Sequence, residues 1–267
     1  LERLNNDLNQ NRFLSLKQRL YNEAVTMLVN KKQILPLRNV EGKKIAVVTF
    51  GDDNSISKRL NDNGIVNKSF IINNNISEEE AKRTAKQFKS YDYVILNIRN
   101  TSSYPSKNYG ITPAMTSFVN HLPNSIKLIL NVFGNPYAID KFNFSKNLSS
   151  LLVGYEDNEM VANSMIDILI GKMSPKGKLP VSLRKYKCGY GLEFKGFLSP
   201  ETLPIALIEN ENIDRIDSLV VDAIKQKAFP GCQILALKDG KIIFDRNYGK
   251  FTYEGEQVVH NDAVYDI

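Results

Sequence analysis

The sequence lacks several residues and patterns that mark particular classes of protein. It contains no Trp, and only two Cys and two His occur among 267 residues. No apolar run approaches the roughly 20 residues needed to span a bilayer, so no membrane span is expected. Neither GxGxxG nor GxxxxGKS/T occurs, so the chain has no phosphate-binding loop of the usual kind. We therefore expect no bound cofactor.

The scarce Cys and His residues also argue against a metal site. Cys188 and Cys232 lie far apart without metal-like spacing, which excludes a disulfide framework and a zinc motif. We expect buried free thiols, while one long-range disulfide stays open. His121 and His260 are widely separated and are expected to be surface residues or hydrogen-bonded core residues.

Charge is distributed unevenly along the chain. Residues 1–210 carry 28 Lys and Arg against 19 Asp and Glu, whereas residues 211–267 carry 7 against 10. The change of sign near residue 210 predicts a domain boundary. The basic residues are scattered, without a dense stripe or interleaved aromatic side chains, so no nucleic-acid partner is expected.

Alternating hydrophobic and amphipathic segments predict an α/β fold. Five apolar runs are typical of buried strands, at 43–50, 65–72, 91–98, 125–133 and 148–155. Helical patterns follow four of them, at 56–60, 77–88, 112–122 and 158–171. This order predicts a doubly wound, mostly parallel sheet.

Capping residues mark several helix boundaries. Ser77 begins one helix with Glu80 at the capping-box position, Thr112 precedes Pro113 at the next, and Gly171 ends the last. An earlier helix is predicted from a stripe that ends before Pro36 and consists of Leu16, Leu20, Ala24 and Leu28.

Ligands of doubly wound sheets bind at the carboxyl ends of the strands. The loops predicted there are GDDNS, RNTSSYPSKNYG, GNPY and YEDNE. Asp52 and Asp53 could form a paired-acid site, although acids after a first strand more often cap the following helix. None of the loops resembles a phosphate cradle.

Two segments carry a resemblance to a known family. YNEAVTMLVNKKQILPL (21–37) and VGYEDNEMVANSMIDILIGKMSPKGKLPVSL (153–183) are similar to the C-terminal α/β domain of glycoside hydrolase family 3. CGYGLEF (188–194) resembles the segment that follows. The resemblance implies a linker helix over 1–36 that leaves an absent TIM barrel, then the α/β domain over 37–200. Gly177 is expected to form a flexible turn before a strand that starts at Pro180.

The same resemblance implies that catalysis lies elsewhere. In this family the nucleophilic Asp belongs to the barrel, and the β-N-acetylglucosaminidase-like branch takes no catalytic group from the second domain. Glu156, Asp157 and Glu159 are therefore interpreted as loop and helix-start residues. No catalytic, cofactor-binding or metal-binding residue is assigned to this chain.

Residues 211–267 resemble the start of a class C β-lactamase-like serine hydrolase. An amphipathic helix is expected first, with a stripe made of Ile213, Ile216, Leu219, Val220, Ala223 and Ile224. FPGCQILALKDGKIIFDRNYG then predicts a hairpin that turns at Asp239-Gly240. The expected boundaries of this truncated module are 208–267, because the chain ends before the family's Ala-Ser-x-x-Lys nucleophile segment.

These observations favour a fragment of a bacterial cell-wall glycoside hydrolase of the β-N-acetylhexosaminidase or β-glucosidase type. Both ends are abrupt, without an initiator Met, so a longer parent enzyme acting on carbohydrate is expected, in the periplasm, at the cell envelope or secreted. The expected partners are the absent barrel, the rest of the serine hydrolase module and a second copy bound through residues 211–267. The alternatives are a carbohydrate-binding or scaffolding module, which the lack of Trp weakens, and a flavin or small-molecule domain.

Overall fold

The computed structural model describes residues 11–51, 55–144, 146–194, 201–202, 210–238, 241–260 and 263. The chain divides into two compact units. The larger unit spans Lys17–Phe197, and the smaller contains Leu1–Leu16 and Leu198–Ile267. Asp52, Asp53 and the predicted hairpin turn at Asp239-Gly240 lie outside the described residues.

A six-stranded sheet in the order β1-β6-β5-β4-β2-β3 forms the larger unit. Its strands are β1 (Thr26–Asn30), β2 (Ile45–Phe50), β3 (Lys68–Ile72), β4 (Tyr93–Ile98), β5 (Lys127–Val132) and β6 (Leu148–Val153). The five predicted strands pair in parallel, and only β1 runs antiparallel, against β6. The predicted mostly parallel α/β class is confirmed.

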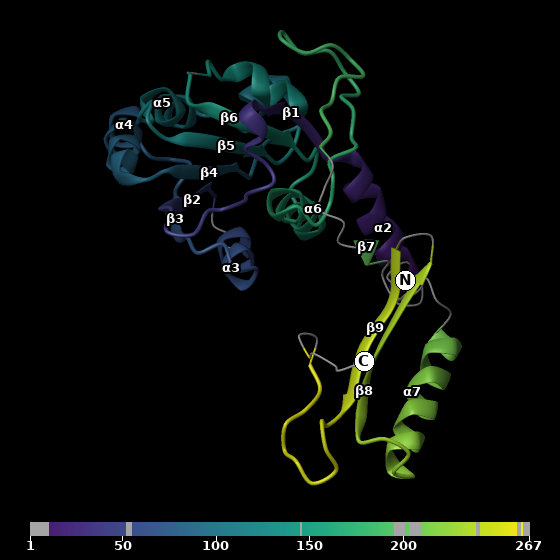
Figure 1. Ribbon diagram of the computed structural model, residues 1–267. Coiled ribbons are helices and arrows are strands. Elements are labelled where there is room, and N and C mark those ends of the chain that lie inside the picture. Colours follow the sequence, from purple (N-terminus) through teal and green to yellow (C-terminus); the bar gives the residue numbers. More distant parts are fainter. Residues whose placement is uncertain are drawn as a thin grey trace. The chain divides into compact units, whose positions relative to one another are not determined.

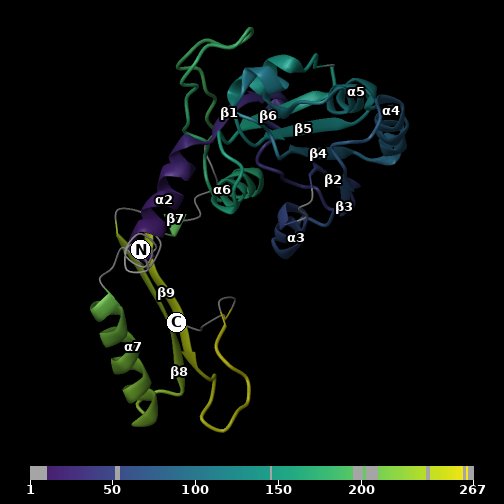
Figure 2. The same cartoon turned by 180° about the vertical axis from the view of Figure 1, so that it is seen from behind.

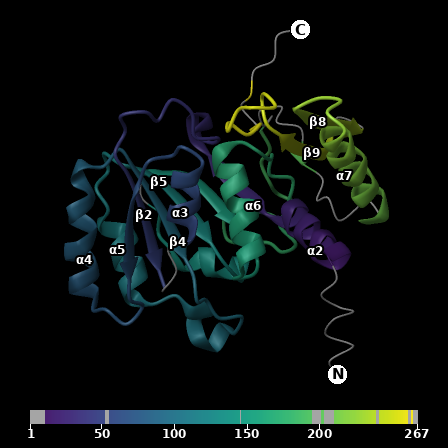
Figure 3. The ribbon, with the colours of Figure 1, turned by 90° about the horizontal axis from the view of Figure 1, so that it is seen from below.

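Helices cover both faces of the sheet (Figure 1). Alternate residues of each strand point into two different hydrophobic cores, one on each face of the sheet. Val48 belongs to the core that also contains residues of α4 (Glu78–Lys86) and α5 (Pro113–His121). Its neighbour Val47 belongs to the other core, which contains residues of α3 (Ser55–Asp62) and α6 (Glu159–Ile170). Figure 3 shows α4 and α5 together on one side of the strands. Short 3-10 segments complete the unit: η1 (Lys31–Gln33), η2 (Gln87–Ser90), η3 (Pro105–Gly110) and η4 (Pro136–Lys141).

The predicted caps are present at three helices. The Ser77 side chain accepts a hydrogen bond from the backbone N–H of Glu80, and Thr112 accepts one from Met115. Gly171 ends α6 in the left-handed conformation, with a φ of 82° that glycine adopts without strain. These local signals place the helix ends within a residue of their predicted positions.

The first helix is shorter than predicted and turns a different face inward. α2 (Asn11–Ala24) ends before Leu28, which is buried in β1. Leu20 is 62% exposed, and Gln18 instead bonds to the backbone of Met160 and the side chain of Ser164. The predicted stripe is therefore wrong, because pairing with β6 draws the apolar TMLVN segment into the sheet.

The predicted strand at Pro180 is also wrong. Within residues 172–194 the structure has no strand, and Leu192 alone forms a bridge, with Met27. Leu179 and Leu183 anchor this segment in the hydrophobic core on the face of the sheet that α4 and α5 also cover. Hydrophobic anchoring therefore holds the segment where a sheet ladder was expected.

A row of polar side chains crosses the apolar sheet. Thr49, Asn97 and Asn131 are in register on neighbouring strands and are buried. Asn131 Nδ2 donates to Asn97 Oδ1 at 2.9 Å, and Asn97 Nδ2 donates to Thr49 Oγ1 at 3.3 Å. Because buried polar groups destabilise a core unless they are paired, this row specifies which strands are neighbours.

The smaller unit has a three-stranded sheet in the order β7-β9-β8, with α7 (Asn210–Lys225) alongside it (Figure 2). Its strands are β7 (Glu201–Thr202), β8 (Gly231–Lys238) and β9 (Lys241–Gly249), and β8 pairs antiparallel with β9. Val220 is buried, but Leu219 is 70% exposed, so Leu219 was wrongly placed on the buried stripe. Asp217 faces the hairpin instead.

The Asp217 carboxylate joins α7 to β9. It accepts hydrogen bonds of 2.5 Å from Arg246 and from the Tyr248 hydroxyl. Burial and the neighbouring carboxylate raise the pKa of Tyr248 well above its ordinary value. The interaction gives this small helix–hairpin pair a specific polar contact in addition to its apolar packing.

Both cysteines are free thiols. Cys188 is exposed and Cys232 is half-buried, so the expectation of buried thiols is wrong for Cys188. His121 Nδ1 lies 2.8 Å from the carbonyl oxygen of Ser117, near the end of α5, and His260 packs against Phe251. Neither histidine lies in a group of metal-ligating side chains among the described residues.

Candidate functional site at the carboxyl edge of the sheet

The loops after β4, β5 and β6 meet at the edge where ligands of doubly wound sheets usually bind. They begin at Arg99, Phe133 and Gly154, directly after strands that are adjacent in the sheet. We call these three loops and the residues that contact them the carboxyl edge. The loop after β2 also reaches this edge, but most of it lies outside the described residues.

An ion pair joins the loops after β4 and β6. Arg99 donates to Asp157 Oδ1 through Nε and Nη2, each at 2.7 Å. The other carboxylate oxygen accepts the backbone N–H of Asn100 at 2.7 Å. The two side chains are only 12% and 20% exposed, and the Arg99 guanidinium also lies 5.1 Å from the centre of the Phe133 ring. Such a carboxylate holds loops together, since its oxygens already accept strong hydrogen bonds.

A second network ties α2 to the loop after β6. The Tyr21 hydroxyl donates to Glu156, and Asn158 Nδ2 donates to both of these groups at 3.0 Å. Burial, followed by the hydrogen bond to Glu156, raises the pKa of Tyr21. Asn158 also caps α6, because its side chain accepts from the backbone N–H of Val161. Glu156 is therefore engaged in structural contacts.

Tyr155 directly precedes the two acids of these networks and turns the chain at the end of β6. It adopts a positive φ of 68°, and its hydroxyl shares a hydrogen bond of 2.6 Å with Thr26 Oγ1. Burial raises the pKa of Tyr155. A non-glycine residue in this conformation is strained unless its surroundings hold it, and here β1 supplies the partner.

The loops after β4 and β5 approach each other closely at Gly134. Thr101 Oγ1 donates to the carbonyl oxygen of Phe133 at 2.5 Å. A Cβ atom at Gly134, where φ is 133°, would lie 1.9 Å from that Thr101 oxygen. The contact therefore requires glycine for its space and for its backbone conformation.

Replacing Gly134 by alanine should lower the free energy of unfolding of the larger unit by about 3 kcal/mol, since a steric clash adds to backbone strain. Urea unfolding followed by circular dichroism would measure the change. Gly64→Ala is the matched control, because Gly64 has a φ of 79° with nothing within 4 Å of its missing Cβ. If both substitutions had equal effects, the close approach at Gly134 would be refuted.

Three tyrosines add aromatic surface to the same edge. Tyr109 of η3 and Tyr137 of η4 stack with ring centres 5.8 Å apart and an interplanar angle of 29°. Tyr104 is 62% exposed. The amines of Lys141 and Lys107 lie 5.5 Å and 5.9 Å from the ring centres of Tyr109 and Tyr104. Exposed aromatic faces beside polar groups can bind the C–H face of a sugar or a neighbouring protein surface.

The acidic residues of the loop after β6 have defined structural positions at this edge. Asp157 and Glu156 are committed to hydrogen bonds, and Glu159 lies in the first turn of α6, as interpreted from the sequence. No cluster of three or more His, Cys, Asp or Glu side chains that could hold a metal occurs among the residues with a described position. None of the described helices has the length and apolarity needed to cross a membrane.

The sequence located these loops but not the contacts between them. Arg99 was overlooked, although an Arg directly after a buried strand is a signal for a partner at the strand ends. The stacking of Tyr109 on Tyr137 joins loops 28 residues apart in the chain and has no local signal.

A three-layer α/β domain, with strand-end loops joined by an ion pair and hydrogen bonds, defines the class of this protein. The family model of the glycosyl hydrolase family 3 C-terminal domain matches residues 25–223. The chain therefore belongs to this family.

Several solved structures are similar to part of this chain. A family 3 β-N-acetylglucosaminidase from Paenibacillus sp. str. FPU-7 has 16% identity and a TM-score of 0.50, over 64% of this chain and 32% of that one. The β-glucoside phosphorylase BglX has 20% identity and a TM-score of 0.46, over 65% and 32%. A Listeria innocua β-glucosidase in complex with isofagomine has 14% identity and a TM-score of 0.45, over 70% and 35%. This chain corresponds to about a third of the length of each. No curated protein matches it by sequence.

Proposed function

We propose that this chain is the non-catalytic second domain of a family 3 glycoside hydrolase that hydrolyses O-glycosyl bonds. The observation that carries the proposal is the family match over residues 25–223. The proposed substrate is a β-linked N-acetylglucosaminide or glucoside, the classes named for the β-N-acetylglucosaminidase and the β-glucosidase of similar fold. The proposed parent is a bacterial cell-wall enzyme in the periplasm, at the envelope or secreted.

The engaged carboxylates support a structural role. Glycoside hydrolysis usually needs two carboxyl groups that flank the scissile bond, one of them able to deliver a proton. At the carboxyl edge, Asp157 accepts from Arg99, and Glu156 accepts from Tyr21. We assign the catalytic carboxylates to a TIM barrel that would precede residues 1–36.

Exposed apolar side chains on α2 support such a neighbour. Phe13, Leu14, Leu16 and Leu20 are all exposed on this one helix. A concentration of apolar surface of this kind is typical of a contact with another protein part. We propose that α2 packs against the barrel.

We further propose that residues 208–267 begin a β-lactamase-like serine hydrolase module. The helix α7 followed by the β8–β9 hairpin is the order of elements in that resemblance. The remainder of the module, or a second copy bound through residues 211–267, would cover the exposed Leu219, Val221 and Leu235 side chains.

A carbohydrate-binding module without catalysis is the second candidate. The stacked Tyr109 and Tyr137 rings, with the exposed Tyr104, favour it, since aromatic faces can serve as sugar platforms. This candidate needs no partner domain.

The natural gene product distinguishes the two candidates. We expect an intact mass of ~100 kDa or more, as for a barrel with two further domains, against 30.2 kDa for this chain. The purified product should hydrolyse a 4-nitrophenyl β-N-acetylglucosaminide or β-glucoside, and this chain alone should not. A 30.2 kDa product that binds sugar without hydrolysing it would refute the glycosidase proposal and favour the binding module.

A further inference from the structure

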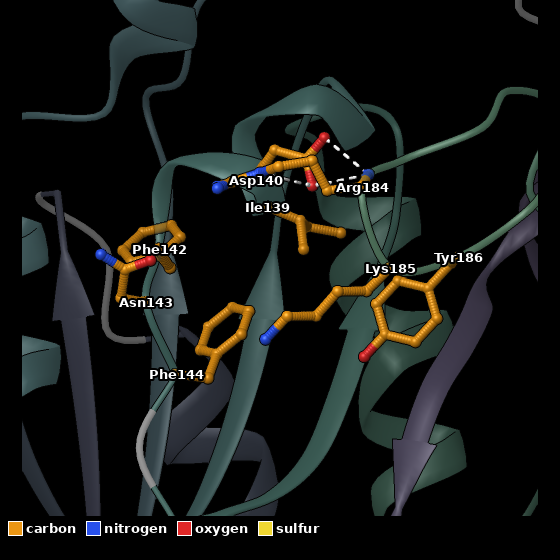
Figure 4. Close-up of a pocket in the computed structure, with 8 residues that line it drawn as sticks. All are labelled: Ile139, Asp140, Phe142, Asn143, Phe144, Arg184, Lys185 and Tyr186. Carbon is orange, nitrogen blue, oxygen red and sulfur yellow. Dashed lines mark hydrogen bonds and ion pairs between the residues drawn. The ribbon is translucent and has the colours of Figure 1, made fainter.

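A pocket lies between the end of η4 and the loop that follows the GKLPVS segment (Figure 4). The empty space between its walls is about 340 Å³, open solvent included. Its walls come from residues 139, 140, 142–144 and 184–186 of the larger unit. None of these residues takes part in the Arg99–Asp157 pair or in the contacts of Tyr21.

Backbone contacts hold the two walls together before any ligand binds. Both oxygens of Asp140 accept the backbone N–H of Arg184 at 3.1 Å. Leu183, next to Arg184, is buried in the core, and its backbone N–H donates to the carbonyl oxygen of Tyr186 at 2.7 Å. A preformed site loses little conformational entropy on binding.

The wall at residues 142–144 and the facing loop are aromatic. Phe142 is buried and stacks on Phe144, with ring centres 5.7 Å apart and an interplanar angle of 19°. The half-buried Tyr186 lines the pocket from the facing loop, and its ring centre lies 5.3 Å from that of Tyr190. These rings present flat apolar surface to the pocket.

Cationic side chains stand at the same pocket. Figure 4 shows the Lys185 side chain extended between Phe144 and Tyr186. No ion pair of Lys185 is found among the residues whose positions are described. Arg184 Nε is 3.8 Å from Asp140, whose oxygens are already bonded to the backbone, and the Arg184 side chain is 65% exposed. The pocket therefore offers positive charge beside aromatic walls.

We propose that this pocket binds a sugar ring that carries a carboxylate. The C–H face of the ring would lie against Phe144 or Tyr186, and the carboxylate would accept a hydrogen bond from Lys185. The inference rests on the proposed function in one respect: a sugar is the expected ligand because the proposed parent enzyme acts on carbohydrate. It adds an acidic substituent to the substrate class.

Titration of the full 267-residue chain, followed by NMR shifts, tests the inference with matched probes. Methyl β-D-glucuronide should bind saturably, and methyl β-D-glucoside, which lacks only the carboxylate, should bind about tenfold more weakly. Lys185→Gln should weaken glucuronide binding about tenfold. Lys187→Gln is the control, because it removes the same charge from an exposed position in the same loop that does not line the pocket.

Equal affinities for the glucuronide and the glucoside, or no effect of Lys185→Gln, would overturn the inference. Tighter binding of benzoate than of the glucuronide would assign the pocket to aromatic acids and would overturn it equally. The readout is binding to the chain itself, whereas the proposed function is tested by hydrolysis in the natural gene product. A negative result in the binding experiment therefore does not refute the proposed function, and absence of hydrolysis does not refute the binding site.

Discussion

Replacing Gly177 by alanine is expected to lower the free energy of unfolding of the larger unit by about 3 kcal/mol or more, because overpacking against a rigid backbone leaves no room to relax. A Cβ atom at Gly177 would lie 2.0 Å from the carbonyl oxygen of Ala24 and 2.5 Å from Thr26 Oγ1. The N–H of Gly177 also donates to the carbonyl of Val25 at 3.2 Å, so the segment cannot move away without losing this bond. Urea unfolding followed by circular dichroism would measure the loss.

Gly189→Ala is the matched control in the same segment. Gly189 has a φ of 83° and nothing within 4 Å of its missing Cβ, so its substitution should cost only about 1 kcal/mol of backbone strain. A Gly177→Ala loss no larger than this control would show that the glycine serves turn flexibility, as the sequence suggested. The structure instead gives the glycine of GKLPVS a packing role, at the junction of α2 and β1.

Most of the central fold follows from local sequence. The five parallel strands are continuous apolar runs, and the helix ends carry Ser77, Thr112 and Gly171 as caps. These signals act within a few residues, so a single sequence reveals them. The right-handed crossover rule then determines the sheet class without any knowledge of contacts.

Features that depend on distant partners were missed. TMLVN continues the helical pattern of the preceding residues, and only its pairing with β6 makes it a strand. Pro180 begins a plausible strand, but no neighbouring edge receives it, and Leu179 and Leu183 are buried instead. Tertiary contacts override local propensity in both segments.

At the carboxyl edge, too, local features could be predicted and contacts between distant residues could not. The strand-end loops could be located from the sequence, whereas the pairing of Arg99 with Asp157 spans 58 residues and required the strand order. The buried row of Thr49, Asn97 and Asn131 is similar, since each polar residue stands in an apolar run and its partner depends on register. Asp52 and Asp53 lie outside the described residues, and their role stays a prediction.

The Arg99–Asp157 pair should contribute strongly to stability. Asp157→Asn is expected to cost about 3 kcal/mol, because removing one partner of a largely buried pair leaves the other charge poorly compensated. The double variant Arg99→Met with Asp157→Asn should cost less than the sum of the single variants, with a coupling free energy of about 2 kcal/mol. Urea unfolding of the four proteins completes the double-mutant cycle.

Amide exchange gives this prediction a second, local readout. The backbone N–H of Asn100 donates to Asp157, so Asp157→Asn should increase its hydrogen exchange, while the N–H of Leu96 within β4 should change less. Glu23→Gln is the control, because it breaks an ion pair on the surface. Glu23 lies 2.9 Å from the Lys176 amine, and both side chains are largely exposed. Removing this ion pair should lower the free energy of unfolding by less than about 1 kcal/mol. Equal costs for Asp157→Asn and Glu23→Gln, with unchanged exchange at Asn100, would mean that Arg99 and Asp157 do not hold the loops after β4 and β6 together. The carboxyl edge would then have to derive its shape from the Tyr21 network and the Thr101–Phe133 contact alone.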